Sequence, residues 1–204
     1  MGISPQQFEQ LQARIRTGTR RSPRASNAPP APPTPASARR IVLGIDPSLR
    51  GTGWGVIQAD RNTAVALGFG TIHCPAVLAR SRCLVRIAEA LRQAIRTHTP
   101  DACAIEGLFF AQNLQTALLM GEARGACLLA AAEFGLEITE IAPRKVKQAI
   151  VGFGGAQKAA VAQMVLRMLS LSELPEPDAA DALAIALAHA RDLFRPALTP
   201  RKPL

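Results

Sequence analysis

Residues 40–46 read Arg-Ile-Val-Leu-Gly-Ile-Asp, a continuous apolar run that ends in an aspartate. A run of this kind, without alternation of polar residues, is typical of a central strand that is covered on both faces. Two further strands are expected at 52–58 and 63–72, with a turn at 60–62 between them. The folded part of the chain therefore opens with a predicted three-stranded antiparallel meander.

Helices and short strands alternate in the rest of the chain. The periodicity of apolar residues and the positions of Pro and Gly predict the following elements: a helix at 78–97, a strand at 102–106, a helix at 113–134, a strand at 137–142 and helices at 143–151, 156–169 and from about 178. This order predicts a mixed α/β domain whose sheet begins with the meander.

The 204 residues suit one domain with flexible ends. Residues 1–39 are rich in Pro, Ala and Arg and are expected to form a disordered basic arm. Residues 40–191 are the expected domain, and 192–204 a flexible tail. The first forty residues carry +6 of the net charge of +9, which leaves +3 for the remainder. The basic balance alone is therefore weak support for a nucleic-acid partner.

Other compositional features exclude several classes of protein. No stretch is long and apolar enough to span a membrane, and the N-terminus does not have the order of a secretory signal. The four cysteines form no C-x-x-C pair, so neither a zinc site nor a disulfide framework is indicated. His73, His98 and His189 are scattered and are not expected to be ligands. We expect a cytoplasmic protein with reduced thiols.

Four carboxylates mark the expected site. Asp46 and Glu106 each end a predicted buried strand, and they would lie side by side if those strands are parallel neighbours. Asp178 and Asp181 share one helix face, although Pro-Asp-Ala-Ala-Asp could also be a simple helix cap. Oxygen-only ligands favour Mg²⁺, with Mn²⁺ as a substitute. Two such ions would favour in-line phosphoryl transfer, as in nucleases.

Basic residues cluster at two predicted helix starts. Arg144, Lys145 and Lys147 lie in the first turn and a half of one helix, and Lys158 opens the next helix after a Gly-rich turn. Such a group could hold phosphates without reading bases. The alternative is an ordinary solvated helix face. The Gly-rich turn is not a P-loop, because the G-x-x-x-x-G-K-[ST] spacing is absent.

Several short motifs carry a resemblance to a known family. They are Gly44-Ile-Asp-Pro-Ser with Thr52-Gly-Trp-Gly-Val, Ala104-Ile-Glu-Gly-Leu-Phe, Ala123-Arg-Gly, Val146-Lys-Gln-Ala-Ile-Val-Gly, and Asp178-Ala-Ala-Asp-Ala-Leu-Ala-Ile-Ala. In this order, from about Arg40 to Arg191, the chain resembles the RuvC Holliday-junction resolvases.

This resemblance implies an RNase H-like fold, a mixed five-stranded sheet of the meander plus parallel strands flanked by helices. It implies a homodimer that nicks two opposed strands of a four-way DNA junction with Mg²⁺, and a RuvA–RuvB branch-migration complex as partner. By the same resemblance the four acids are the metal ligands, Phe109 stacks near the crossover, and Lys147 and Lys158 contact DNA.

Two departures from the family pattern and two alternatives remain open. Gln112 stands where relatives often have a basic residue, and the first forty residues are extra. The Gly44-Ile-Asp-Pro-Ser segment is also compatible with the first phosphate loop of an actin-like ATPase, but such a protein needs two domains of this type. A non-catalytic nucleic-acid binder is the other alternative, which the retention of four acids disfavours because they repel phosphate.

Overall fold

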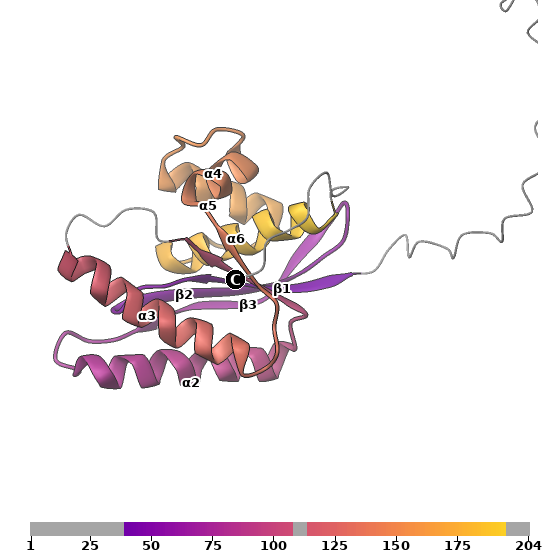
Figure 1. The fold of residues 1–204 in the computed structure, drawn as a ribbon. Helices are drawn as coiled ribbons and strands as arrows, with labels where there is room; N and C mark the ends of the chain where they lie inside the picture. Colours follow the sequence, from indigo (N-terminus) through magenta and orange to yellow (C-terminus); the bar gives the residue numbers. More distant parts are fainter. Residues whose placement is uncertain (1–38, 108–113, 195–204) are drawn as a thin grey trace, which may run out of the picture. The chain divides into compact units, whose positions relative to one another are not determined.

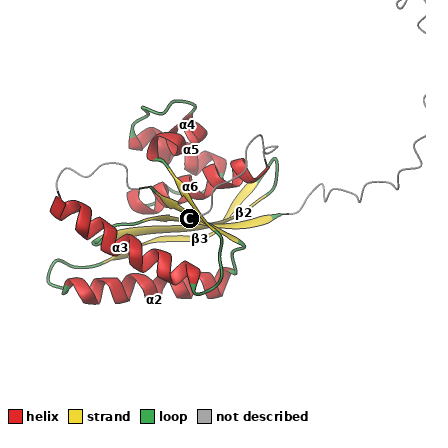
Figure 2. Cartoon of the chain, in the orientation of Figure 1, coloured by secondary structure: helices red, strands yellow, loops and turns green. Residues whose placement is uncertain are grey.

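The strand β1 (Arg40–Asp46) is the middle strand of a five-stranded sheet with the order β3-β2-β1-β4-β5. In the computed structural model, residues 39–107 and 114–194 are described. Helices cover both faces of the sheet, as Figures 1 and 2 show. The order of elements is the one that the sequence predicts, and the mixed five-stranded sheet is confirmed.

The first three strands form the predicted antiparallel meander. β2 (Gly51–Ala59) pairs with β1 and with β3 (Ala64–His73), which has a bulge opposite Val56 and Ile57. The carboxylate of Asp60 closes the turn, because it accepts hydrogen bonds from the main-chain N–H groups of residues 62 and 63 at 2.8 and 2.7 Å. Self-bonding of this kind is the reason that Asp favours turns.

The other two strands are parallel to β1. β4 (Ala102–Glu106) lies directly beside β1, and β5 (Ile138–Ile141) lies beside β4. Parallel neighbours place their carboxyl ends at one edge of the sheet. The residues that end β1 and β4 therefore meet at this edge.

Two helical layers enclose the sheet (Figure 1). One face carries α2 (Arg80–His98) and α3 (Leu114–Ala132). The other face carries α4 (Pro143–Val151), α5 (Lys158–Met168) and α6 (Pro177–Phe194). The strand β1 contributes to both cores, since Val42 packs toward α6 and Leu43 toward α2, and both are fully buried. A strand buried on both faces explains the unbroken apolar run at residues 40–46.

Glycines allow α6 to approach the sheet closely. A Cβ atom on Gly44 would overlap the main-chain oxygen of Ala182, and one on Gly53 would overlap that of Asp178. A Cβ on Gly55 would lie 2.7 Å from Leu183 Cδ2. Side chains at these positions would push the helix away from the strands. The glycines of β1 and β2 thus set the depth at which the start of α6 sits.

Residues 39–107 and 114–194 also bear on the classes of protein that composition argues against. None of the helices there has the length and hydrophobicity that a bilayer crossing requires. All four cysteines are buried and unpaired, as the sequence predicts. These described residues form one sheet, whereas an actin-like ATPase would require two domains of this type.

Candidate active site

Asp46 and Glu106 meet at the carboxyl edge of the sheet. Ile45 of β1 pairs with Ile105 of β4 in parallel register, and each acid is the next residue along its strand. Both side chains are partly buried. The predicted side-by-side placement of these two carboxylates is confirmed by this register.

The helix α6 brings the second pair of acids to the same edge. Asp178 lies in the first turn of the helix, and Asp181 follows one turn later. A Cβ on Gly51 of β2 would lie 2.5 Å from the Oδ2 atom of Asp178. Asp46 is paired with Gly53, directly beneath the main chain of Asp178. Because α6 packs closely against these glycines, both of its acids lie toward Asp46.

Burial and like charges strongly perturb the pKa of Asp46. Desolvation, followed by repulsion from Glu106 and Asp181, raises the pKa of Asp46 from 3.8 to about 8. Burial also raises the pKa of Glu106, although the hydrogen bond from Asp46 opposes this effect. The raised pKa favours the protonated form of Asp46, which donates a hydrogen bond to Glu106. Carboxylates in this state attract a cation that would replace the proton.

A lysine already supplies one positive charge to the site. Lys158, the first residue of α5, places its Nζ atom 2.5 Å from Oδ2 of Asp181. This contact raises the pKa of Lys158. The positive charges of Lys158 and Lys147 both lower the pKa of Glu106. The ammonium group of Lys158 therefore supplies positive charge that offsets the repulsion between the carboxylates.

Asp178 is less closely tied to the other acids. Burial raises its pKa, Lys158 lowers it, and the charges of Asp181, His73 and Glu176 also act on it. His73, at the end of β3, contacts Glu176 at 3.0 Å, just ahead of α6. Asp178 therefore sits at the rim of the site, beside the contact that joins β3 to the start of α6.

The donor set fits a hard divalent cation. All four candidates are carboxylates, two of them end adjacent parallel strands, and a lysine pairs with a third. Within the described residues, no three His, Cys, Asp or Glu side chains are already gathered closely enough to hold one ion. The chemistry of the ligands thus favours Mg²⁺ or Mn²⁺. Binding of the ion would draw the carboxylates closer together.

The predicted basic residues lie at two adjoining helix starts. Lys147 is half-buried, and its positive charge lowers the pKa of Glu106. Arg144 and Lys145 are exposed; the former packs over Gly154, and the latter forms an ion pair of 2.9 Å with Asp192. Phe109 and Gln112, which the sequence analysis singles out, lie outside the described residues.

The remaining histidines are not part of the carboxylate site. The ring of His98 lies 6.1 Å from that of Trp54, between α2 and β2. His189 is buried within α6.

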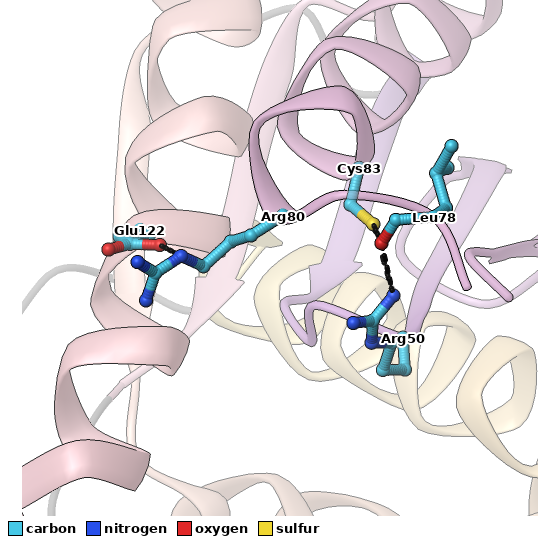
Figure 3. Close-up of polar contacts among 5 residues, drawn as sticks. All are labelled: Arg50, Leu78, Arg80, Cys83 and Glu122. Atoms are coloured by element: carbon cyan, nitrogen blue, oxygen red, sulfur yellow. Dashed lines mark hydrogen bonds and ion pairs between the residues drawn. The ribbon is translucent and has the colours of Figure 1, made fainter. Parts of the chain in front are cut away.

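The loop that follows Asp46 is held from the opposite side of the sheet. Arg50 Nη1 donates to the main-chain oxygens of Pro75 and Leu78 at 2.7 and 3.1 Å and contacts Cys83 Sγ at 3.3 Å. Figure 3 shows the last two contacts and the neighbouring ion pair of Arg80 with Glu122. Arg50 and Arg80 line a cavity of about 450 Å³ that opens beside α3. The arginine therefore fixes the loop between the first two strands.

Sequence reasoning missed three features of this site. The first two are the glycine seat of α6 and the pairing of Lys158 with Asp181. The third is Arg124 of α3, which reaches the main-chain oxygen of Glu106. Glycines at every second position from Gly51 to Gly55 were the only available signal for the seat. No local pattern reveals the other two, because their partners are distant in sequence.

Comparison with known proteins identifies relatives over most of the described chain. The family model for crossover junction endodeoxyribonuclease RuvC matches residues 42–189. The protein of that name from Akkermansia muciniphila is 47% identical over 148 residues, which are 72% of this chain and 89% of that protein. Its counterpart from Alkaliphilus oremlandii is 45% identical over 151 residues, 74% of this chain and 92% of that one.

Solved structures agree with this similarity. Thermus thermophilus RuvC, in complex with Holliday junction substrate, superimposes with a TM-score of 0.72 at 35% identity, over 81% of this chain and 99% of that one. The yeast mitochondrial Holliday junction resolvase has the same fold, with a TM-score of 0.53 at 11% identity over 78% of this chain and 82% of that one. The RNase H-like architecture predicted from the resemblance is therefore confirmed.

Proposed function

Because this chain belongs to the RuvC family of crossover junction endodeoxyribonucleases, we propose that Asp46, Glu106, Asp178 and Asp181 form a Mg²⁺-dependent active site that nicks two opposed strands of four-way junction DNA. The observation that carries this proposal is the meeting of Asp46 and Glu106 at the carboxyl ends of adjacent parallel strands, beneath the start of α6. Two carboxyl groups are held together there at a cost in desolvation and repulsion. A bound cation would offset that cost.

The four acids act as metal ligands, and their protonation affects metal binding. When bound, Mg²⁺ supplies Lewis acidity that activates water and neutralises charge on the phosphate, and two ions would serve both sides of the displacement. Asp46 would have to give up a proton to act as a ligand, so cation binding is expected to depend on pH. If Asp181 bound a cation in place of Lys158, the ammonium group of Lys158 would be free to contact the phosphate.

The basic helix starts hold the DNA backbone in this proposal. Lys158 pairs with Asp181 at the start of α5, the charge of Lys147 acts on Glu106, and Arg144 and Lys145 extend the positive surface along the first turns of α4. The main-chain N–H groups at the N-termini of α4 and α5 also favour phosphate binding, because this end of a helix carries partial positive charge. Together with Phe109, whose stacking role stays a prediction, they would bind junctions without reading a base sequence.

A second copy of the chain completes the proposed enzyme. A junction offers two strands to be nicked, while each chain has one site, so a symmetric pair is the simplest assembly. Support comes from the outward face of α3, where Leu114, Leu118 and Leu129 are 76%, 59% and 55% exposed. Gly121 and Gly125 lie between them on the same stripe with open space above. Small and apolar residues in one row let two helices approach closely.

Other expectations remain predictions. They are the basic arm at 1–39, the domain limits of 40–191 and a tail at 192–204, whose first residues belong to α6. A branch-migration complex as partner, the cytoplasm as the place of action, and any DNA contact of the arm also remain predictions. Buried, unpaired thiols support a reducing compartment.

The decisive experiment follows cleavage and binding of a synthetic four-way junction separately. Each strand is labelled in turn, and the purified protein is incubated with Mg²⁺, Mn²⁺ or EDTA. We expect paired nicks at symmetric positions with either metal and none in EDTA. The variant Asp46→Asn should bind the junction but leave it intact.

The control for this experiment is Glu89→Gln, which neutralises an exposed acid of α2 far from the carboxylate edge. This variant should cleave at the wild-type rate. Binding of junctions by the wild-type protein without metal-dependent cleavage would favour the non-catalytic alternative. Cleavage by Asp46→Asn at the wild-type rate would show that the site lies elsewhere.

A further inference from the structure

Arg124 is a buried charged residue that the proposed chemistry does not use. It lies on the inner face of α3 among Ala123, Cys127 and Ala130, and it is 8% exposed. Its Nη1 atom donates to the main-chain oxygen of Glu106 at 2.5 Å, and its Nη2 atom donates to Oε2 of Glu140 at 2.8 Å. One guanidinium therefore joins α3 to the ends of β4 and β5.

The Glu106 end of β4 needs an external fixing point. The parallel pairing of β1 with β4 runs as far as Ile45 and Ile105, one residue short of the acids. On the other side, the N–H of Gly107 donates to Ile141 at 2.9 Å. The carbonyl of Glu106 belongs to the same peptide unit as that N–H, so the bond from Arg124 holds this unit at both of its polar atoms. Rotation of the unit would swing the Glu106 side chain away from Asp46.

The charges of the active site also act on residues of the inner face of α3. Burial raises the pKa of Cys127, one turn beyond Arg124, to about 12, and the charges of Arg124 and Asp46 both act on this thiol. Arg124 is thus placed beside the site but approaches Glu106 through its main chain rather than its carboxylate. It can hold the acid in place without occupying the position of a cation.

A buried guanidinium is a costly way to gain stability alone. Arg124 is buried although its partner Glu140 is exposed, and burying it requires desolvation that a well-packed apolar residue would avoid. The planar fork of Arg offers what such a residue lacks, since two N–H groups reach two acceptors on different strands at once. This geometry at a ligand residue indicates a role in the site.

We propose that Arg124 is a positioning residue that fixes the main chain of Glu106, so that its carboxylate is held ready for a divalent cation beside Asp46. This proposal rests on the proposed function only in taking Glu106 as a metal ligand. Residues that orient ligands from outside the coordination sphere typically change metal affinity or activity by about 10- to 100-fold when they are replaced.

The test measures Mn²⁺ binding by calorimetry, without DNA and without turnover. Arg124→Lys keeps the charge beside Glu140, but its single ammonium head is drawn to that carboxylate and leaves the Glu106 carbonyl. A second variant combines Arg124→Met with Glu140→Gln, which also removes the carboxylate that would lose its partner, while the Glu106 carbonyl still lacks its donor. The control is Arg92→Met, which breaks the ion pair between Arg92 of α2 and Glu133, the residue that follows α3, away from the site.

We expect both Arg124 variants to bind Mn²⁺ about tenfold or more weakly, while their junction affinity in EDTA stays within about twofold of wild type. Arg92→Met should match the wild-type protein in both measurements. Wild-type Mn²⁺ affinity in either Arg124 variant would overturn the proposal. So would loss of cooperative unfolding in both variants, since Arg124 would then serve the core alone.

The reference variant Glu106→Gln separates this proposal from the one on which it rests. It should weaken Mn²⁺ binding at least as much as the Arg124 variants. If Glu106→Gln binds Mn²⁺ like the wild-type protein, the metal site itself has been assigned wrongly. If only the Arg124 variants do so, the ligand assignment stands and the positioning role fails.

Discussion

The ammonium group of Lys158 lies 2.5 Å from the Asp181 carboxylate, within a group of acids that would otherwise repel one another. Lys158 opens α5, whereas Asp181 lies in α6, so the contact joins two elements of one helical layer. The lysine and a divalent cation both neutralise the same carboxylates. They are therefore expected to compete for Asp181 in the absence of DNA.

Replacement of this lysine tests the competition. We expect Lys158→Met to bind Mn²⁺ more tightly by up to about fivefold in the absence of DNA, an effect of the size expected for a partly exposed ion pair. Cleavage should nevertheless become slower, because the charge offered to the phosphate is lost. Calorimetry and single-turnover cleavage measure the two effects. Arg167→Met, which removes an exposed charge from the same helix, should change neither, and weaker Mn²⁺ binding by Lys158→Met would refute competition.

The raised pKa of Asp46 predicts how pH affects the metal-free protein. The pKa is 3.8 in an unfolded chain and about 8 in the folded protein. Between these values the folded state holds a proton that the unfolded state releases, so stability falls as pH rises through this window. Thermal unfolding in EDTA should therefore show a lower midpoint at pH 9 than at pH 6.

The same measurement on Asp46→Asn identifies the responsible group. An asparagine can donate to Glu106 as the protonated aspartic acid does, but it has no proton to lose in this range. We expect the variant to be more stable than the wild-type protein at pH 9 and to show a smaller change between the two pH values. An unchanged pH dependence would assign the effect to another residue.

Both strand-end acids could be predicted from sequence because their signals are local. The apolar runs before Asp46 and Glu106 indicate buried strands, and parallel neighbours place their carboxyl ends together. The two acids of α6 follow from helical spacing. What spacing could not supply was the distance between α6 and the sheet, which depends on how closely main-chain atoms can pack.

The tertiary contacts of the site illustrate the limit of sequence reasoning. Arg124 contacts residues 18 positions before and 16 positions after it, on two different strands. The short motif Ala123-Arg-Gly draws attention to this position but does not predict which residues Arg124 contacts. Lys158 was predicted to contact DNA, and its pairing with Asp181 depends on how α5 packs against α6. Such contacts follow from packing geometry, which local patterns do not encode.

The glycine seat of α6 can be tested by adding one methyl group. In Gly53→Ala, the new Cβ would overlap the main-chain oxygen of Asp178, so α6 must shift. We expect the free energy of unfolding to fall by about 1–3 kcal/mol, as for other overpacked sites. Mn²⁺ affinity should fall as well, since both acids of the helix move away from Asp46.

The matched control for this substitution is Gly70→Ala in β3. Its Cβ would lie 3.3 Å from Nε1 of Trp54, a side chain that can adjust. Denaturant unfolding and Mn²⁺ calorimetry should show a smaller loss of stability than Gly53→Ala and no loss of metal affinity. Equal effects of the two substitutions would mean that the seat has no special relation to the site.

The outward stripe of α3 predicts the oligomeric state and the form of the product. In Leu118→Glu, a charge replaces an exposed leucine in the middle of the stripe, so two copies should no longer pack there. We expect sedimentation velocity to show a monomer, while Mn²⁺ affinity is retained because each chain holds its own acids. Val77→Glu adds the same charge at a residue that is 96% exposed on another segment, and it should leave the assembly unchanged. On a circular DNA with an extruded cruciform, paired nicks linearise the circle and single nicks only relax it, so the Leu118 variant should yield relaxed circles. Linear product from a monomeric variant would contradict the proposal that one chain of a pair cuts each strand.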